Sequence, residues 1–121
     1  MDQAVILSTA RTPIGKAYRG TFNDTDAPTL ASYAINASIA KAGIDPSEVE
    51  DVIMGAAVQQ GTQGYNIGRL SAAASGLPSH VPGMSVDRQC ASGLMAIAIG
   101  AKQIACNEMD IVIGGGVESI S

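Results

Sequence analysis

The side chain with the clearest potential for covalent chemistry is the thiol of Cys90. It follows a short apolar run at residues 82–86, and a long helical pattern begins at about residue 91. A thiol in this position lies beside the unpaired N–H groups and the positive dipole end of the helix. These groups stabilise the thiolate, which is the nucleophilic form of cysteine. The pattern therefore indicates a nucleophile.

The neighbours of Cys90 suit attack on a carbonyl group. Arg88 adds positive charge, and the small side chains at residues 91–93 leave room for a bulky substrate. The backbone N–H of Cys90 itself could donate to the oxyanion that forms at an attacked carbonyl. The competing interpretation is a small buried hydrophobe, which is the commonest role of a free cysteine.

The second cysteine and the single histidine are weaker candidates. Cys106 falls late in the apolar helix, where the helix dipole disfavours a thiolate, so we expect it to pack. His80 lies in a loop that suits a surface or interface residue. Two cysteines separated by fifteen intervening residues and one histidine match no zinc ligand set, so no metal site is predicted.

Three further features could contact a ligand. The glycines at residues 114–116 follow an apolar run, but they lack the spacing of a dinucleotide-binding loop and favour close backbone approach. Arg11 and Lys16 could meet an anion, although solvated charges are the simpler interpretation. Glu118 could support a site at the carboxyl edge of a sheet, or it could be exposed.

Short apolar runs alternate with helical patterns along the chain. Strands are predicted at residues 4–8, 51–58, 82–86 and 110–113, and helices at residues 26–43, 66–74 and 91–107. Strands separated by helical crossovers predict an α/β fold in the order β-α-β-α-β-α-β with a mostly parallel sheet. No repeat or linker divides residues 1–121, which we treat as one domain.

The third predicted helix is apolar nearly all round. Its only charge between residues 91 and 104 is Lys102. Such a helix must be buried on most sides, and a four-stranded sheet covers one side only. We therefore expect another subunit, or a second half of the polypeptide, to cover the rest.

Composition excludes several classes of protein. Lys and Arg number 7 and Asp and Glu number 11, so the net charge is −4, which disfavours nucleic-acid partners and a polybasic membrane-surface role. Hydrophobic residues make up 46%, which excludes intrinsic disorder. The uncharged stretch at residues 89–101 is shorter than the roughly 20 residues that a membrane span needs. A start without a basic leader favours a cytoplasmic location.

Three motifs carry a resemblance to the thiolase family. They are ARTPIG at residues 10–15, VDRQCASG at residues 86–93 and GGGVES at residues 114–119. They occur in the family's order and span essentially the whole chain. The resemblance implies two similar halves in an α-β-α-β-α layered sandwich, of which this chain would be the incomplete N-terminal half.

The resemblance also implies an activity. It implies acyl transfer between CoA thioesters, with formation or cleavage of 3-ketoacyl-CoA through an acyl group on Cys90. CoA and acyl-CoA would be substrates, with no cofactor. The implied assembly is a homodimer or a tetramer, with residues 59–66 near the subunit contact, or a pairing with a second chain.

Other catalytic residues of thiolases, two histidines and an acid/base cysteine, belong to the C-terminal half, and His80 matches none of them. We therefore expect the isolated chain to be inactive. Two alternatives stay open. One is another condensing enzyme, such as a ketoacyl synthase. The other is a non-catalytic thiolase-like subunit or assembly module.

Overall fold

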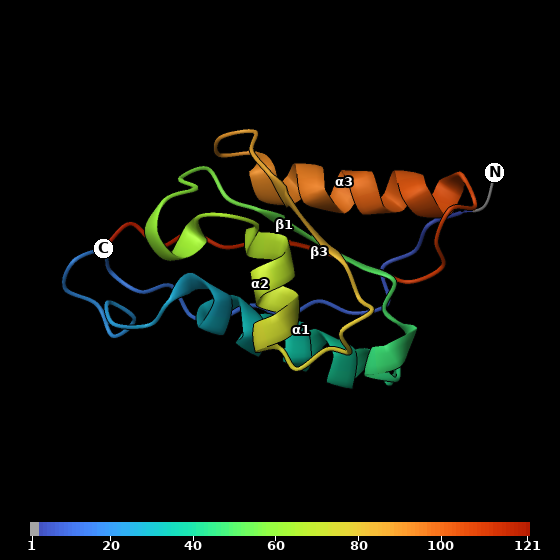
Figure 1. Ribbon diagram of the computed structural model, residues 1–121, viewed down its shortest axis with the longest axis horizontal. Helices are drawn as coiled ribbons and strands as arrows, with labels where there is room; N and C mark the ends of the chain where they lie inside the picture. The colour runs from blue at the N-terminus through green and yellow to red at the C-terminus, as the bar shows by residue number, and fades with distance from the viewer. Residues whose placement is uncertain (1–2) are drawn as a thin grey trace.

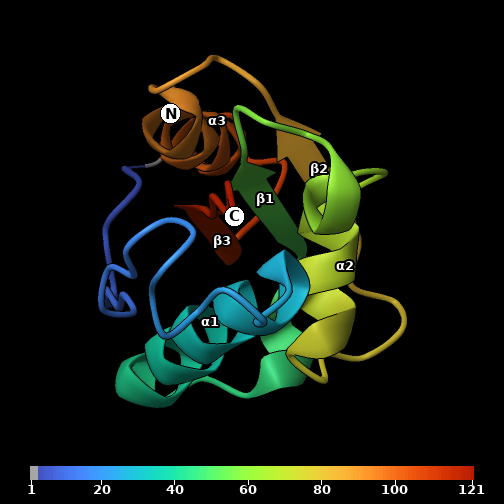
Figure 2. The ribbon, with the colours of Figure 1, turned by 90° about the vertical axis from the view of Figure 1, so that its left-hand side faces the viewer.

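Three parallel strands form the centre of the computed structural model, which describes residues 3–121. The elements are α1 (Ala27–Ala42), η1 (Pro46–Glu48), β1 (Asp51–Gly55), η2 (Gly61–Gln63), α2 (Ile67–Ala74), β2 (Gly83–Val86), α3 (Ser92–Ala105) and β3 (Val112–Gly116). The strand order is β2-β1-β3. α3 covers one face of the sheet, and α1 and α2 lie on the other (Figures 1 and 2). The predicted α/β class and parallel sheet are confirmed.

Strand β1 lies in the middle of the sheet. Its Ile53 pairs with Met84 of β2 on one side and with Gly114 of β3 on the other. Parallel neighbours need a long crossover, and α2 and α3 supply the two crossovers. All three strands therefore end at the same edge of the sheet, and the turn that carries Cys90 follows the end of β2.

The helix ends fall where local side chains predict them. The Asp26 carboxylate accepts a hydrogen bond from the Thr29 N–H at 2.8 Å, and Asn66 does the same for Arg69 at 3.1 Å. Gly43 ends α1 with φ 68°, a left-handed conformation that glycine adopts without strain. The polar connection after α1 contains the single helical turn η1.

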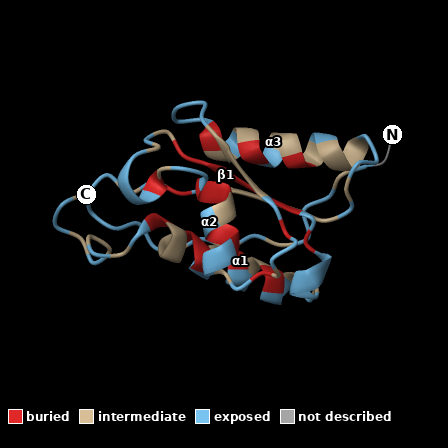
Figure 3. Ribbon diagram, viewed as in Figure 1, coloured by how far each residue is buried: buried red, intermediate tan, exposed pale blue. Residues whose placement is uncertain are grey.

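The larger hydrophobic core lies between the sheet and helices α1 and α2. Alternate residues of β1 point to opposite faces, so Val52 and Met54 belong to this core. Ile53 is fully buried beneath α3, where its Cδ1 lies near Gly100. The buried parts of the helices face the sheet (Figure 3). No helix within residues 3–121 is long and apolar enough to cross a membrane.

The strand predicted at residues 4–8 is not formed. The segment is extended but pairs with none of the three strands, and Val5, Ile6 and Leu7 are 66%, 76% and 62% exposed. It is held instead along α1, where the Ser8 hydroxyl donates to the Ser38 carbonyl at 2.7 Å. An apolar run becomes a strand only beside a partner strand, and the described residues provide none here.

The strand predicted at residues 110–113 lies further along the chain, at Val112–Gly116. The glycines at residues 114–116 form most of β3 and pair with residues 53–55 of β1. A Cβ on Gly114 would lie 2.8 Å from the Cα of Ile97 in α3. Glycine is thus needed because the helix backbone packs directly on the strand.

We expect the free energy of unfolding to fall as the pH drops below the ordinary range of carboxyl groups. Hydrogen bonds to the charged carboxylates lower three pKa values. The backbone N–H of Thr29 lowers the pKa of Asp26, and the side chain and N–H of Ser47 lower the pKa of Asp45. The backbone N–H groups of Asp110 and Ile111 lower the pKa of Glu50. As the pH falls, the unfolded chain binds protons at these carboxylates before the folded protein does. The stabilisation that the carboxylates give the folded state is therefore complete above the unfolded-state pKa values and is lost as the pH falls through the lower native values.

Denaturant unfolding between pH 7 and pH 3 would measure this dependence. The variant Glu50→Gln should show a flatter dependence on pH than the wild type. An unfolding free energy that is the same at both ends of the range would contradict the expectation.

Candidate active site

Cys90 lies in the turn between β2 and α3. It comes four residues after β2 ends at Val86 and two residues before α3 begins at Ser92. Its thiol is free and its side chain is exposed. The structure thus places the cysteine at the amino end of the helix, as the sequence predicts, and not among packed side chains.

The turn is held by bonds on both sides of the cysteine. The Asp87 carboxylate accepts from the Gln89 N–H at 2.9 Å. The Ser92 hydroxyl accepts from the Arg88 N–H at 2.7 Å and donates to the Gln89 carbonyl at 2.6 Å. These bonds fix the direction from which the chain enters α3.

Gln89 adopts a left-handed conformation, with φ 49°. This is uncommon for a residue with a side chain and costs on the order of 1–3 kcal/mol. The turn bonds offset that cost, and the result is a sharp change of direction directly before Cys90. Sharp strand-to-helix turns present the nucleophile in some α/β enzymes.

The start of α3 rests on the ends of β1 and β3 with little between the backbones. A Cβ on Gly55 would lie 2.2 Å from the carbonyl carbon of Ser92, and one on Gly116 would lie 3.1 Å from the Cα of Gly93. The strand ends are joined to each other, because the Val117 N–H donates to the Gly55 carbonyl at 3.0 Å. The position of the cysteine turn is therefore set by the sheet.

A cavity of about 240 Å³ opens beside the thiol. It is lined by Gly55, Gln89, Cys90, Ser92, Gly93, Gly116, Val117 and Glu118. These residues come from the carboxyl ends of the strands and from the start of α3. Ligands of open parallel sheets bind at this edge, so the position suits a substrate as well as a nucleophile.

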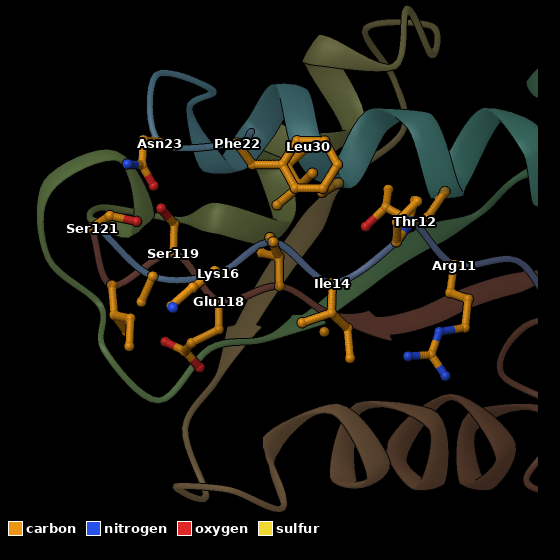
Figure 4. Close-up of a pocket in the computed structure, with 18 of the residues that line it drawn as sticks. Arg11, Thr12, Ile14, Lys16, Phe22, Asn23, Leu30, Glu118, Ser119 and Ser121 are labelled. Carbon is orange, nitrogen blue, oxygen red and sulfur yellow. The ribbon is translucent and has the colours of Figure 1, made fainter. Parts of the chain in front are cut away.

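A larger cavity of about 480 Å³ lies between residues 10–17, α1 and the segment after β3. Arg11 and Lys16 line this cavity, not the one beside Cys90 (Figure 4). Glu118 borders both cavities. Glu118 is therefore the only one of these three charged residues that the structure brings to the cysteine site.

The other candidate residues lie away from the thiol. His80 precedes β2 and approaches the Ser47 carbonyl at 3.4 Å, whereas Cys90 follows the far end of that strand. Cys106 follows the opposite end of the 14-residue helix α3, roughly 20 Å along its axis. Its side chain is exposed, so the prediction that it packs is wrong: the helix ends at Ala105 and leaves the cysteine in the turn beyond it. Within residues 3–121 no three His, Cys, Asp or Glu side chains are grouped so as to hold a metal ion.

Sequence reasoning missed the role of Gln63. This side chain is 1% exposed and bonds with Glu118 and with the backbone of Ser119. Gln63 lies in a polar, glycine-bearing loop, where a glutamine is ordinarily solvated. No local signal distinguishes it from its neighbours.

These features define an α/β protein that presents one exposed thiol at a strand-to-helix turn, over the carboxyl edge of a parallel sheet. Residues 4–121 match the family model of the thiolase N-terminal domain. The chain therefore belongs to the thiolase family.

Curated relatives of the chain bear thiolase and acyltransferase names. It is 39% identical over 121 residues to a 3-ketoacyl-CoA thiolase of Bacillus subtilis and to an acetyl-CoA acetyltransferase of Cupriavidus necator. It is 42% identical over 120 residues to the peroxisomal 3-ketoacyl-CoA thiolase 5 of Arabidopsis thaliana. These alignments cover 99–100% of the chain but only 31%, 30% and 26% of the respective relatives. The chain thus spans less than a third of their length.

We expect Gly55→Ala to destabilise the protein by about 3 kcal/mol, because the new methyl group would overlap the backbone at the start of α3. Gly93→Ala is the matched control. A Cβ at Gly93 meets nothing closer than 3.6 Å, and alanine favours a helix by up to about 1 kcal/mol over glycine. Denaturant unfolding of both variants tests this difference. Equal stabilities would show that the backbones are less closely packed than described.

Proposed function

We propose that this chain supplies the acyl-accepting cysteine of an acyl-CoA acyltransferase that forms or cleaves 3-ketoacyl-CoA. The observation that carries the proposal is the exposed thiol of Cys90, beside a cavity at the carboxyl edge of the sheet. Membership of the thiolase family and the names of the relatives support the choice of a CoA thioester as substrate.

In the proposed first step the Cys90 thiolate attacks the carbonyl carbon of an acyl-CoA. A bond forms from sulfur to that carbon, and the bond from the carbon to the CoA sulfur breaks. CoA leaves as a thiolate and takes up a proton. The backbone N–H of Cys90 donates to the oxyanion during this step. A covalent intermediate divides the transfer into two easier reactions.

In synthesis the carbanion of acetyl-CoA then attacks the acyl group on Cys90, the Cys90 thiolate leaves, and 3-ketoacyl-CoA is released. In degradation the Cys90 thiolate instead attacks the 3-keto carbonyl of 3-ketoacyl-CoA, the bond between the α- and β-carbons breaks, and acetyl-CoA leaves as a carbanion that takes up a proton. The thiolate of free CoA then attacks the acyl group on Cys90 and releases a shorter acyl-CoA. CoA and acyl-CoA are substrates, and the scheme uses neither a metal nor a redox cofactor.

The proposal requires further residues that bind CoA and transfer protons. By resemblance these are two histidines and a cysteine of the C-terminal half, on the same or a second polypeptide. The surface is consistent with such a cover, because Leu94 and Ile97 of α3 are exposed although the helix is apolar. Within the described part of the chain, the extended residues 4–8 also have no strand beside them.

We also propose that the protein acts as a homodimer or a tetramer. The loop at residues 59–66 is the expected contact. Its Tyr65 is 99% exposed and adopts a left-handed conformation, with φ 57°. An aromatic side chain held out in this way suits an interface between subunits.

We expect Cys90 to become acylated when the assembled protein is mixed with acetyl-CoA. Mass spectrometry should find one added acetyl group on the peptide that contains Cys90, and Cys90→Ser should abolish both the label and acyl transfer. Cys106→Ser is the matched control and should keep both. Acyl transfer that survives in Cys90→Ser would refute the proposed role.

Alkylation separates this function from a non-catalytic thiolase-like subunit. Iodoacetamide should react with Cys90 faster than with Cys106, and acyl-CoA should protect Cys90. Equal and slow reaction at both cysteines would favour the non-catalytic subunit. Acyl transfer from an acyl-carrier protein but not from CoA would favour a ketoacyl synthase.

The isolated polypeptide 1–121 should show negligible cleavage of 3-ketoacyl-CoA, because it contains the proposed nucleophile without the proton-transferring residues. Loss of the 3-ketoacyl-CoA enolate absorbance measures this cleavage. Adding the polypeptide that completes the fold should restore activity. Robust cleavage by 1–121 alone would contradict the proposed division of roles.

A further inference from the structure

Glu118 ties the segment after β3 to the segment after β1. Its carboxylate accepts hydrogen bonds from the backbone N–H of Ala57 and of Val58, each at 2.9 Å. It also accepts one from the side-chain amide of Gln63 at 3.0 Å. Three N–H donors from one loop thus converge on a single carboxylate, and hydrogen bonds to a charged acceptor are stronger than neutral ones.

Gln63, in the segment after β1, bonds in turn to the backbone of the segment after β3. Its buried side chain donates to the Val58 carbonyl and accepts from the Ser119 N–H. The side chain of residue 118 therefore holds the loop at residues 57–63, and a side chain of that loop holds the backbone of residue 119. The two segments are fixed relative to each other by bonds from both sides.

Glu50 makes the same kind of connection at the other end of the two strands. It precedes β1, and its carboxylate accepts from the backbone N–H of Asp110 and of Ile111, which precede β3. The five residues of β1, roughly 17 Å in length, lie between the two connections. Only Glu118 lies at the edge where Cys90 is found, and only Glu118 borders its cavity.

We infer that Glu118 is a positioning residue for Cys90. It holds together the ends of β1 and β3, and the start of α3 rests directly on those ends at Gly55 and Gly116. A change in their spacing moves the turn at residues 87–91, because no side chain lies between the backbones to absorb the shift. Glu118 thus acts on the thiol through the sheet edge and does not touch the substrate.

The test compares Glu118→Gln with Glu50→Gln in the assembled protein that contains this chain. Each variant removes one charge and weakens one connection between β1 and β3, so both should lose thermal stability. The first measurement is the cleavage of acetoacetyl-CoA by CoA, and it rests on the proposed function. Glu118→Gln should lower kcat at least tenfold with KM within threefold of the wild type, whereas Glu50→Gln should keep kcat within twofold.

A second measurement does not depend on acyl transfer. The rate of Cys90 alkylation by iodoacetamide should change at least threefold in Glu118→Gln and stay unchanged in Glu50→Gln, with Cys106 as the internal control. Wild-type behaviour of Glu118→Gln in this assay, or an equal effect of both substitutions, would overturn the inference. If the wild type forms no acyl-enzyme, the proposed function fails, and the alkylation rates alone decide on Glu118.

Discussion

The backbone of α3 begins directly on the backbones of β1 and β3, and the placement of the thiol depends on this contact. Glycines at positions 55 and 116 permit it, because a Cβ on Gly55 would overlap Ser92 and one on Gly116 would lie 3.1 Å from the Cα of Gly93. Side chains between a helix and a sheet can adjust by changing rotamer, whereas touching backbones cannot. The cysteine turn is therefore as rigid as the sheet on which it rests. A precisely placed nucleophile requires such rigid support. The abundance of glycine in the chain has a structural cause at this contact.

The features that could be predicted from the sequence are those fixed by neighbouring residues. Asp26 and Asn66 cap helices by bonding to N–H groups three residues ahead, and Gly43 ends a helix through its own backbone conformation. The position of Cys90 follows from the change of an apolar run into a helical pattern. Each of these needs only a few consecutive residues, so the predicted helices and the helix-start position of the cysteine agree with the structure.

The features that could not be predicted depend on segments far apart in the chain. Residues 4–8 have the composition of a strand, but composition does not supply a partner to pair with. Glycines 114–116 resemble a strand end until the packing of Ile97 on Gly114 is known. The bonds of Glu118 reach 60 and 61 residues back to Val58 and Ala57, and no local pattern marks them. The position of the cysteine could be predicted from neighbouring residues, whereas the bonds that support it depend on the three-dimensional fold.

The exposed apolar surface and the proposed chemistry lead to the same requirement. An acyl group on Cys90 is a thioester, and water competes with CoA or a carbanion for its carbonyl carbon unless the site is closed. In residues 3–121 the side chain of Cys90 is exposed, and Leu94, four residues further along, is 72% exposed. Covering this end of α3 would bury apolar area and exclude water in one step. If the proposed function holds, the same contact that covers the apolar surface of α3 therefore also protects the acyl group from water.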